Sequence, residues 1–317
     1  MGKQMKKLLL LSLLTLVTGC RNHNYQSDVV KETYVHRYGV SIPKNDWERQ
    51  GRDGQIVQLC KNGVTITRSY LGGSLNGKTT FTFPNSTTIE RIQTYEHGVL
   101  ISDLKNYETG VPCLERRFEG ENLTKVTGWY EDGTPSLTES YADGYLTSGE
   151  YRNLLNIIES RVENGRGIRI KRDQEGELLF RDNIQNGQMV ERITYYPNGD
   201  PSAVVPYDNG LVNGQRLTFL QGGLPNTVEQ WVHGKQEGIT IIYQNGEKIS
   251  ETPYLNGEKN GIEKRFRNGQ ELVAEATWKN GVLHGQTTLF VGENTQTEWY
   301  HEGKMVSRNT YERMNLR

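Results

Sequence analysis

The sequence predicts an all-β protein, an elongated repeat array of antiparallel β-hairpins in a meander. An aromatic residue is followed three positions later by glycine about every eleven or twelve residues, as in Tyr95–Gly98, Trp231–Gly234 and Tyr300–Gly303. Many units end in Asn-Gly or Asp-Gly, which favour the positive φ angles of tight hairpin turns. The runs between turns alternate polar and apolar side chains and lack a helical period. A period this regular indicates copies of one small unit and not one large core.

Composition supports an array and excludes two classes of partner. Hydrophobic residues make up 34% of the chain, yet it contains 35 glycines and 17 tyrosines, a mixture unlike that of disordered segments. Losing a leader with three lysines would leave 34 of the 37 basic residues against 38 acidic ones, a net charge near −4. We therefore expect no nucleic-acid partner and no polybasic membrane-binding surface.

Residues 1–19 have the layout of a bacterial lipoprotein signal peptide. Three lysines precede the apolar stretch 8–17, which is too short to span a bilayer. Val-Thr-Gly before Cys20 resembles a lipobox, whose cysteine is acylated and becomes the new N-terminus; the alternatives are an ordinary secretory signal and a short membrane anchor. Arg21 follows the cysteine in place of the aspartate that retains many such lipoproteins in the inner membrane. We expect lipid attachment at Cys20 and a place in the bacterial cell envelope, in the outer membrane rather than the inner one.

The remaining chain divides by its pattern into four parts. We predict a lipidated tether over 20–33, an N-terminal cap over 34–53, the array over 54–305 and a C-terminal tail over 306–317. The period is weakest over 150–185. An apolar cluster there predicts either a kink between two arrays or a packing plug, with irregular strand favoured over a short helix; it consists of Leu154, Leu155, Ile157 and Ile158.

Cys60 and Cys113 are about four strands apart in this array, roughly 20 Å at the strand spacing of a sheet. That distance exceeds the limit for bridged cysteines, so we predict no disulfide between them.

Glycines mark the predicted turns, and alternate turns carry a second glycine in the pattern G-x-x-x-G. The double pattern makes successive strand pairs inequivalent, with a longer loop on the same edge of each repeat; Gly73–Gly77 is an early copy. The predicted turn glycines are Gly98, Gly110, Gly133, Gly144, Gly199, Gly210, Gly214, Gly234, Gly238, Gly246, Gly257, Gly261, Gly269, Gly281, Gly285 and Gly303.

The combination of aromatic-x-Asn-Gly-x-x-x-Gly, a strand, a second aromatic-x-Asn-Gly and a strand resembles the variant MORN repeats of bacteria. The resemblance covers about 54–305 and is clearest from residue 187 onward. It implies an all-β meander and a protein partner, because members of that family are described as antitoxin-like. An antitoxin normally meets its toxin in the cytoplasm, whereas the lipobox predicts export.

No enzyme motif is found, and we predict no catalytic residues, cofactor or metal site. Serine-hydrolase, zinc-protease and phosphate-loop patterns are missing from the sequence. His97, His233, His284 and His301 occupy turn or loop positions that other repeats fill with Asn, Asp or Glu, so we interpret them as turn substitutes. The repeat aromatics allow two interpretations: stacking on one another along one face, which we favour, or a ladder that binds a sugar chain, peptide or lipid.

These observations predict a non-catalytic, lipid-anchored envelope protein that presents a repeat surface to an unknown protein partner. One alternative is a cell-wall or carbohydrate-binding protein, although the Gly-Trp pair of choline-binding modules occurs only once, at Gly128-Trp129. Another is an antitoxin-like protein that neutralises a toxin. A methyltransferase carrying MORN repeats ranks last, because residues 21–53 are too few for such a catalytic domain.

Overall fold

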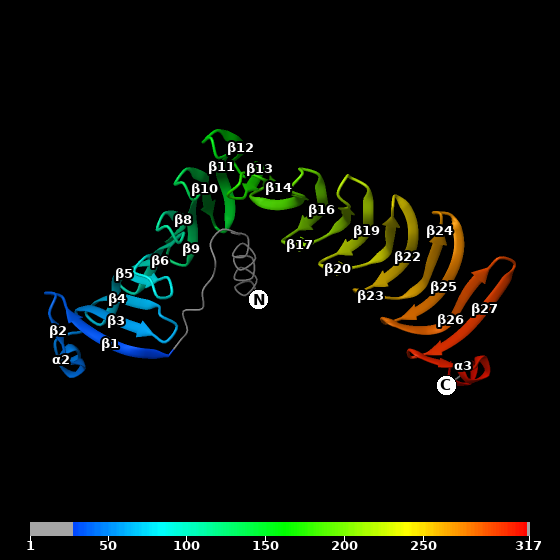
Figure 1. Ribbon diagram of the computed structural model, residues 1–317, viewed down its shortest axis with the longest axis horizontal. Coiled ribbons are helices and arrows are strands. Elements are labelled where there is room, and N and C mark those ends of the chain that lie inside the picture. The colour runs from blue at the N-terminus through cyan, green and yellow to red at the C-terminus, as the bar shows by residue number, and fades with distance from the viewer. Residues whose placement is uncertain (1–27, 316–317) are drawn as a thin grey trace. The chain divides into compact units, whose positions relative to one another are not determined.

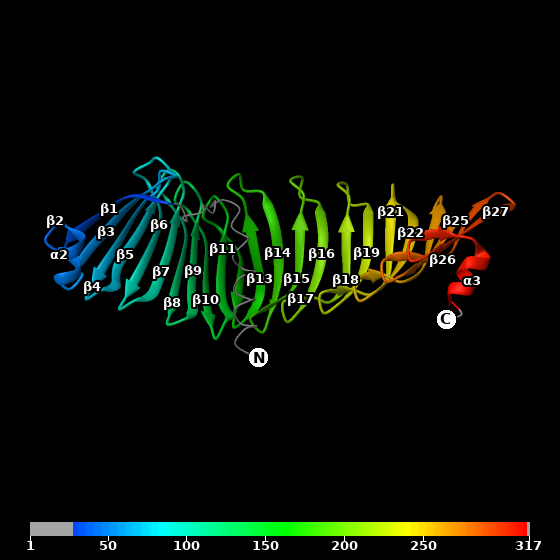
Figure 2. The ribbon, with the colours of Figure 1, turned by 90° about the horizontal axis from the view of Figure 1, so that it is seen from below.

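The computed structural model describes residues 28–315, so the predicted signal peptide, Cys20 and most of the tether lie outside the described residues. The described residues form 28 strands and two helices. The strands build one open antiparallel sheet in a meander, which confirms the predicted all-β hairpin array (Figure 1). Within each part of the sheet the strands follow one another in chain order (Figure 2).

The elements are β1 (Val29–His36), β2 (Ser41–Ile42), α2 (Lys44–Arg49), β3 (Gly54–Cys60), β4 (Thr65–Leu71), β5 (Ser74–Thr82), β6 (Ile89–Glu96), β7 (Val99–Asn106), β8 (Pro112–Glu119), β9 (Asn122–Trp129), β10 (Pro135–Ala142), β11 (Tyr145–Arg152), β12 (Ile158–Glu163), β13 (Arg166–Arg172), β14 (Leu178–Gln185), β15 (Gln188–Tyr195), β16 (Pro201–Asp208), β17 (Leu211–Val212), β18 (Gly214–Phe219), β19 (Pro225–Val232), β20 (Lys235–Gln236), β21 (Gly238–Gln244), β22 (Glu247–Leu255), β23 (Glu258–Lys259), β24 (Gly261–Arg267), β25 (Glu271–Lys279), β26 (Val282–Val291), β27 (Asn294–His301), β28 (Lys304–Val306) and α3 (Arg308–Asn315).

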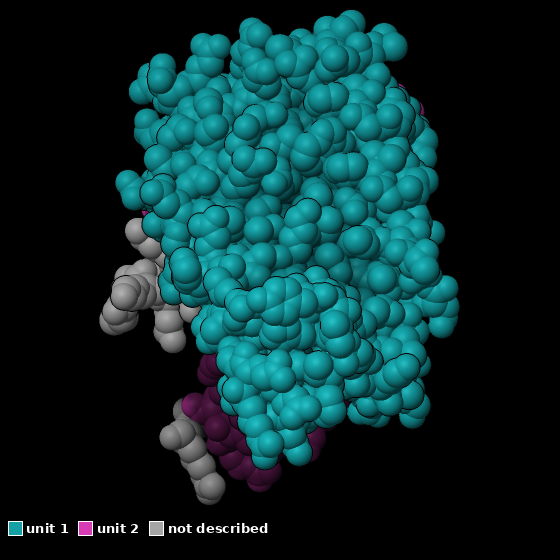
Figure 3. All heavy atoms as spheres, turned by 90° about the vertical axis from the view of Figure 1, so that its left-hand side faces the viewer, with its two compact units in different colours: residues 1–177, 184–188 teal, residues 178–183, 189–317 magenta. Residues whose placement is uncertain are grey.

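The chain divides into two compact units, coloured separately in Figure 3. Unit 1 comprises residues 1–177 and 184–188, and unit 2 comprises residues 178–183 and 189–317. The stretch 150–185, for which the sequence favoured irregular strand over a short helix, contains the strands β12, β13 and β14, and the pairing of β11 with β12 has a register shift. Apolar residues replace the repeat aromatics in this stretch, but the turns survive, and the turns are sufficient to keep the meander regular.

The N-terminal end of unit 1 is covered by α2 and β2. β1 pairs with β3 along its length and with β2 at Tyr34 and Val35. Trp47 of α2 is only 3% exposed. Its ring lies 5.8 Å from that of Tyr34 and 6.2 Å from that of Tyr70 on β4. The helix thus shields aromatic side chains that a bare terminal repeat would expose to water.

The C-terminal residues of unit 2 form a helix where the sequence predicted a tail. Tyr311 of α3 packs its ring 5.0 Å from that of Trp299 on β27, and the Arg308 guanidinium lies 5.7 Å from the same indole. None of the helices in residues 28–315 is long and apolar enough to span a membrane.

Small apolar clusters replace a single core in unit 1. One cluster contains the free thiol of Cys60 with Val64, Ile66 and Phe81. Another contains Cys113 with Tyr107, Leu114, Leu123 and Val126. Each cluster is built from neighbouring strands, as expected when a repeat contacts only its neighbours.

The turns along the two edges of the sheet differ in type. The sequence predicted such an alternation with the longer loop at the G-x-x-x-G pattern, whereas the five-residue turns lie on the opposite edge. At most turns of the first edge both central residues have positive φ, as at Asn209 (49°) and Gly210 (79°), which is the two-residue turn expected for Asn-Gly. At the opposite, second edge, Tyr107 and Val111 close a five-residue turn in which Gly110 alone has positive φ.

The turns around Gly133 and Gly199 on the second edge are also of the five-residue type. Asp132 accepts a hydrogen bond from Thr134 N (2.8 Å) and Asn198 accepts one from Asp200 N (3.1 Å). This local bond stabilises a right-handed backbone conformation, with negative φ, at the residue before the glycine. Two-residue turns return on this edge at Asn245 and Asn268, both with φ of 51°.

Candidate interaction surface

The G-x-x-x-G loops join consecutive repeats along the first edge. In four of these loops the residue before the second glycine accepts a hydrogen bond from the backbone N–H of the next turn. These pairs are Asn76 with His97 (3.1 Å), Asn213 with His233 (3.2 Å), Glu237 with Asn256 (2.7 Å) and His284 with Glu302 (3.3 Å). The loop is therefore a connection between repeats, and its polar third residue is a structural acceptor.

Backbone bonds between turns follow the same period. The turn glycine of one repeat donates its N–H to a carbonyl just beyond the turn of the preceding repeat. The pairs are Gly98 to Leu75, Gly234 to Val212, Gly257 to Gln236, Gly281 to Lys259 and Gly303 to Leu283, all 2.8–2.9 Å long. These bonds satisfy backbone groups at an edge that would otherwise expose them to other chains.

The repeat aromatics hold the array together, but not by stacking on one another. From residue 189 onward, ring–ring contacts in the described residues involve only His284, Trp299, His301 and Tyr311. Successive repeat aromatics on one edge are two strands apart, about 10 Å, which is too far for ring contact. Lysine cations lie over the rings: Lys259 is 4.4 Å from the Trp278 centroid and Lys248 is 4.1 Å from the Phe266 centroid.

Tyrosines at the second edge reach into the following repeat through their hydroxyl groups. Tyr107 donates to the carbonyl of Trp129 (2.7 Å), Tyr130 to that of Arg152 (2.6 Å) and Tyr196 to that of Phe219 (2.8 Å). Burial raises the pKa of Tyr107 and of Tyr130 to about 12. These phenols therefore remain neutral donors at any physiological pH.

Several aromatics at the first edge, such as Tyr141, donate to an acid two residues earlier. Glu139, 4% exposed, accepts bonds from Tyr141 (2.6 Å) and Tyr151 (2.8 Å). Burial, with the Glu139 charge beside it, raises the pKa of Tyr151 far above its usual value. Trp231 donates in the same way to Glu229, at 2.8 Å.

Two buried acids of unit 2, Glu229 and Glu263, have lowered pKa values. Burial alone would raise the pKa of Glu229, but hydrogen bonds from Arg216, Trp231 and Thr227 outweigh it and lower that pKa. The same balance lowers the pKa of Glu263, which accepts bonds from Arg265 and Lys259.

Unit 2 is therefore expected to lose stability in acid. A carboxyl whose folded pKa lies below its unfolded value stabilises the fold above pH 4.5, and this contribution disappears as pH falls through the folded pKa. Denaturant midpoints measured between pH 7 and pH 3 should decline below about pH 5. The variant Glu229→Gln/Glu263→Gln should show a shallower decline; an equal decline in both proteins would contradict the assignment.

The most exposed large apolar side chain among the described residues of unit 1 is that of Leu155 on the turn Asn153–Ile157, which we call the Leu155 turn. Leu155 is 77% exposed and Ile157 is 57% exposed, so these two members of the predicted apolar cluster project into solvent, whereas Leu154 and Ile158 are half-buried. The turn is fixed from within, because Asn153 Oδ1 accepts the N–H groups of Leu155 and Ile157, each at 3.0 Å. Asn153 N also donates to the carbonyl of Ile157 (3.0 Å).

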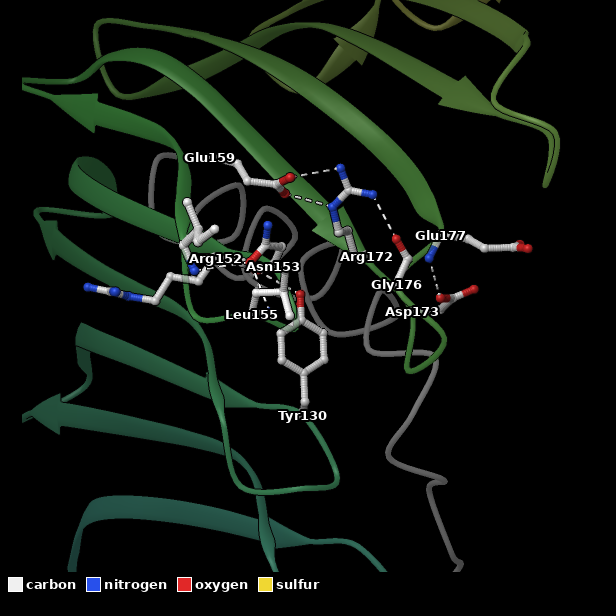
Figure 4. A network of polar contacts seen from close by, with 10 residues as sticks. Tyr130, Arg152, Asn153, Leu155, Glu159, Arg172, Asp173, Gly176 and Glu177 are labelled. Carbon is white, nitrogen blue, oxygen red and sulfur yellow. Dashed lines mark hydrogen bonds and ion pairs between the residues drawn. The ribbon is translucent and has the colours of Figure 1, made fainter.

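The neighbouring strand and turn support the Leu155 turn (Figure 4). Arg172 donates two hydrogen bonds to the carboxylate of Glu159 (2.6 and 3.1 Å) and a third to the carbonyl of Gly176 (2.7 Å). Glu177 N donates to Asp173 Oδ1 at 2.8 Å. This bond closes the adjacent turn in the same way as the bond to Asn153 Oδ1 closes the Leu155 turn. Tyr130 reaches the carbonyl of Arg152 from the other side. The Leu155 turn is consequently a preorganised apolar projection.

The histidines agree with their interpretation as turn substitutes, since His284 accepts from Glu302 as asparagine and glutamate do elsewhere. Within residues 28–315 no group of three or more His, Cys, Asp or Glu side chains is arranged to hold a metal ion.

Sequence reasoning missed two features of this surface. It identified no buried acids, whereas Glu90, Glu139, Glu229 and Glu263 are all less than 9% exposed. It also assigned no binding role to the cluster around Leu155. The asparagine at 153, placed two residues before Leu155, was the available signal for a closed turn.

Comparisons with known proteins add no family. No family model and no curated protein matches the chain. Among solved structures, a chain of a TcdB2–TccC3–Cdc42 complex matches with a TM-score of 0.19 and 12% identity, over 86% of this chain and 16% of that one. BamB from Moraxella catarrhalis matches with a TM-score of 0.15 and 7% identity, over 87% of this chain and 86% of that one. This chain spans only about a sixth of the first match, and at these TM-scores neither similarity informs the fold or the function.

Proposed function

We propose that this protein is a non-catalytic, lipid-anchored component of the bacterial envelope that binds another protein through its MORN-like repeat surface. The observation that carries the proposal is the Leu155 turn, where two large apolar side chains are exposed on a backbone that is already fixed. Large apolar anchors supply most of the energy in protein interfaces. A surface that is ordered before binding loses little conformational entropy on association.

The proposed anchor and partner are consistent with each other. Cys20 in its lipobox-like context would tether the array by acyl chains, as the resemblance implies, so that the partner is an envelope protein. The antitoxin-like role implied by the MORN resemblance fits an exported chain poorly. The carbohydrate-binding alternative needs aromatic rings with open faces. Lys259 instead covers one face of Trp278, and Lys248 covers one face of Phe266.

Photo-crosslinking in the cell tests this proposal. A photoreactive amino acid at position 155 of the full chain should give a discrete crosslinked band, and Ile157→Glu in the same chain should weaken that band about tenfold, because a charge cannot enter a dry contact without cost. Position 224 is the matched control, since Leu224 is 47% exposed on a turn of the same edge in unit 2.

Two outcomes would contradict the proposal. One is crosslinking at 155 no stronger than at 224, which would remove the Leu155 turn as an anchor. The other concerns the tether: Cys20→Ser should move the chain out of the membrane fraction and abolish the band, and a chain that stays membrane-bound would refute lipidation at Cys20.

A further inference from the structure

Seven of the exposed residues that flank the two-residue turns of the first edge in unit 2 form a continuous row on one face of the sheet, between Leu211 and Val282. They occupy cross-strand positions next to the turn glycines, where Val232 pairs with Lys235, Leu255 with Glu258 and Lys279 with Val282. We call them the rim row, which consists in chain order of Leu211, Val232, Lys235, Leu255, Glu258, Lys279 and Val282.

The apolar members of the rim row are unusually open to solvent. Leu211 is 49% exposed, Val232 48%, Leu255 47% and Val282 44%. The next residues inward on the same face are uncharged, and they include Ile239, which is 52% exposed and pairs with Pro253, and Ile262, 51% exposed. The rim row therefore borders an apolar strip of the kind that marks a contact surface.

The charged members of the rim row form no ion pair within the described residues, in contrast to other charges of unit 2. Asp182 is paired with Arg192, and Glu229 is paired with Arg216. Glu263 is paired with both Lys259 and Arg265. Lys235, Glu258 and Lys279 instead point outward from the turns without an intramolecular counter-charge.

The order of the rim row is nearly self-complementary about Leu255. Successive members lie on successive strands, about 4.8 Å apart. Reversing the row about Leu255 brings Lys235 opposite Glu258 and Leu211 opposite Val282. The remaining pair sets Val232 against the aliphatic stem of Lys279, which can cover apolar surface while its ammonium group stays in water.

We infer that the rim row binds a second copy of this chain in an antiparallel, two-fold arrangement centred on Leu255. Two-fold symmetry makes every contact occur twice, so one complementary ion pair becomes two, and the assembly closes at a dimer. The Lys235–Glu258 pairs fix the register, and the four apolar side chains with the adjacent isoleucines supply the buried area. A common lipid anchor on one membrane would raise the effective concentration of the two copies. The surface lies in unit 2, so this inference is independent of the Leu155 turn in unit 1.

Charge exchange tests the arrangement in the full chain. Two differently tagged copies are expressed together in the native host, and their co-purification is measured. Lys235→Glu in both copies, or Glu258→Lys in both, should reduce co-purification about tenfold, because each sets like charges opposite one another twice. The double variant Lys235→Glu/Glu258→Lys should restore it, and so should one copy carrying Lys235→Glu beside a copy carrying Glu258→Lys.

Cysteine crosslinking tests the position of the axis. Leu255→Cys should give at least fivefold more covalent dimer with a short thiol crosslinker than Val291→Cys, because residue 255 meets itself at the axis. Val291 is the matched control, being 60% exposed in unit 2 at the opposite edge. Equal dimer yields from the two positions, or failure of the double charge variant to restore co-purification, would overturn the inference even if the Leu155 turn captures a partner.

Discussion

Asp182→Ala is expected to lower the free energy of unfolding of unit 2 by about 3–5 kcal/mol, since it leaves a charge buried without its partner. Asp182 is completely buried, and Arg192 donates to both of its carboxylate oxygens at 2.6 and 2.9 Å. The guanidinium side chain is only 12% exposed and lies 4.1 Å from the Phe180 ring centroid. Water therefore cannot replace the missing carboxylate without opening the strands.

Chemical denaturation followed by hydrogen exchange of peptides from 178–195 measures this effect. Asp208→Ala is the control, because that carboxylate is exposed at a turn and its loss should change stability by less than about 0.5 kcal/mol. Replacing both partners, as in Asp182→Leu/Arg192→Met, should recover most of the loss. If Asp182→Ala is no worse than Asp208→Ala, the buried pair does not stabilise unit 2.

The tight turns that depend on glycine are the part of this fold that could be predicted from the sequence. Asn-Gly at 209–210 and 256–257 needs positive φ at two adjacent residues, and this local requirement specifies a two-residue turn without any tertiary information. Because the turns recur at a fixed period, the sequence was enough to predict the meander. The same reasoning failed at Gly110, where the preceding threonine stays right-handed and the turn lengthens to five residues.

The candidate surface was harder to predict because it depends on which side chains a single-layer sheet covers. Glu139 and Asp182 look like solvated strand residues in sequence, yet their neighbours on adjacent strands bury them. Conversely, Leu155 and Ile157 belong to an apolar cluster in the sequence and are exposed, since a turn at a sheet edge has no layer above it. The contacts that hold the two buried acids come from other strands: Tyr151 is 12 positions from Glu139, and Arg192 is 10 positions from Asp182.

The contacts of the repeat aromatics were also hard to predict from the sequence. Their period indicates a structural role, but the partners of the rings follow from strand spacing. Rings two strands apart cannot stack, so lysines one strand away occupy the space, as Lys259 does over Trp278. The lysine stems also cover apolar surface that stacking would have covered. A repeat array of low hydrophobic content thus obtains part of its packing from charged side chains.

Trp47→Ala should destabilise the N-terminal end of unit 1 by about 3–5 kcal/mol, because a large buried aromatic is removed and the site cannot fully collapse. Trp47 is 3% exposed and lies against Tyr34 and Tyr70, so its loss opens the aromatic cluster that covers the first strands. In an array that is stabilised by neighbour contacts, the damage should remain local and decline with distance from the end. Peptides from β1, β3 and β4 should exchange amide hydrogens faster, while peptides from β22 to β26 should be unchanged.

Tyr38→Ala provides the matched control for Trp47→Ala. Tyr38 is an aromatic residue of the same N-terminal segment, but it is 74% exposed, so its removal should leave exchange in β1, β3 and β4 as in the parent chain. Comparing the two variants shows whether exchange depends on the buried ring that α2 places over the strands or on the loss of any aromatic side chain. If Trp47→Ala accelerates exchange uniformly through both units, the chain unfolds as one cooperative body, and the description of α2 as a local cover for the array end is wrong. If neither variant changes exchange, β1 and β3 are held by their backbone pairing alone.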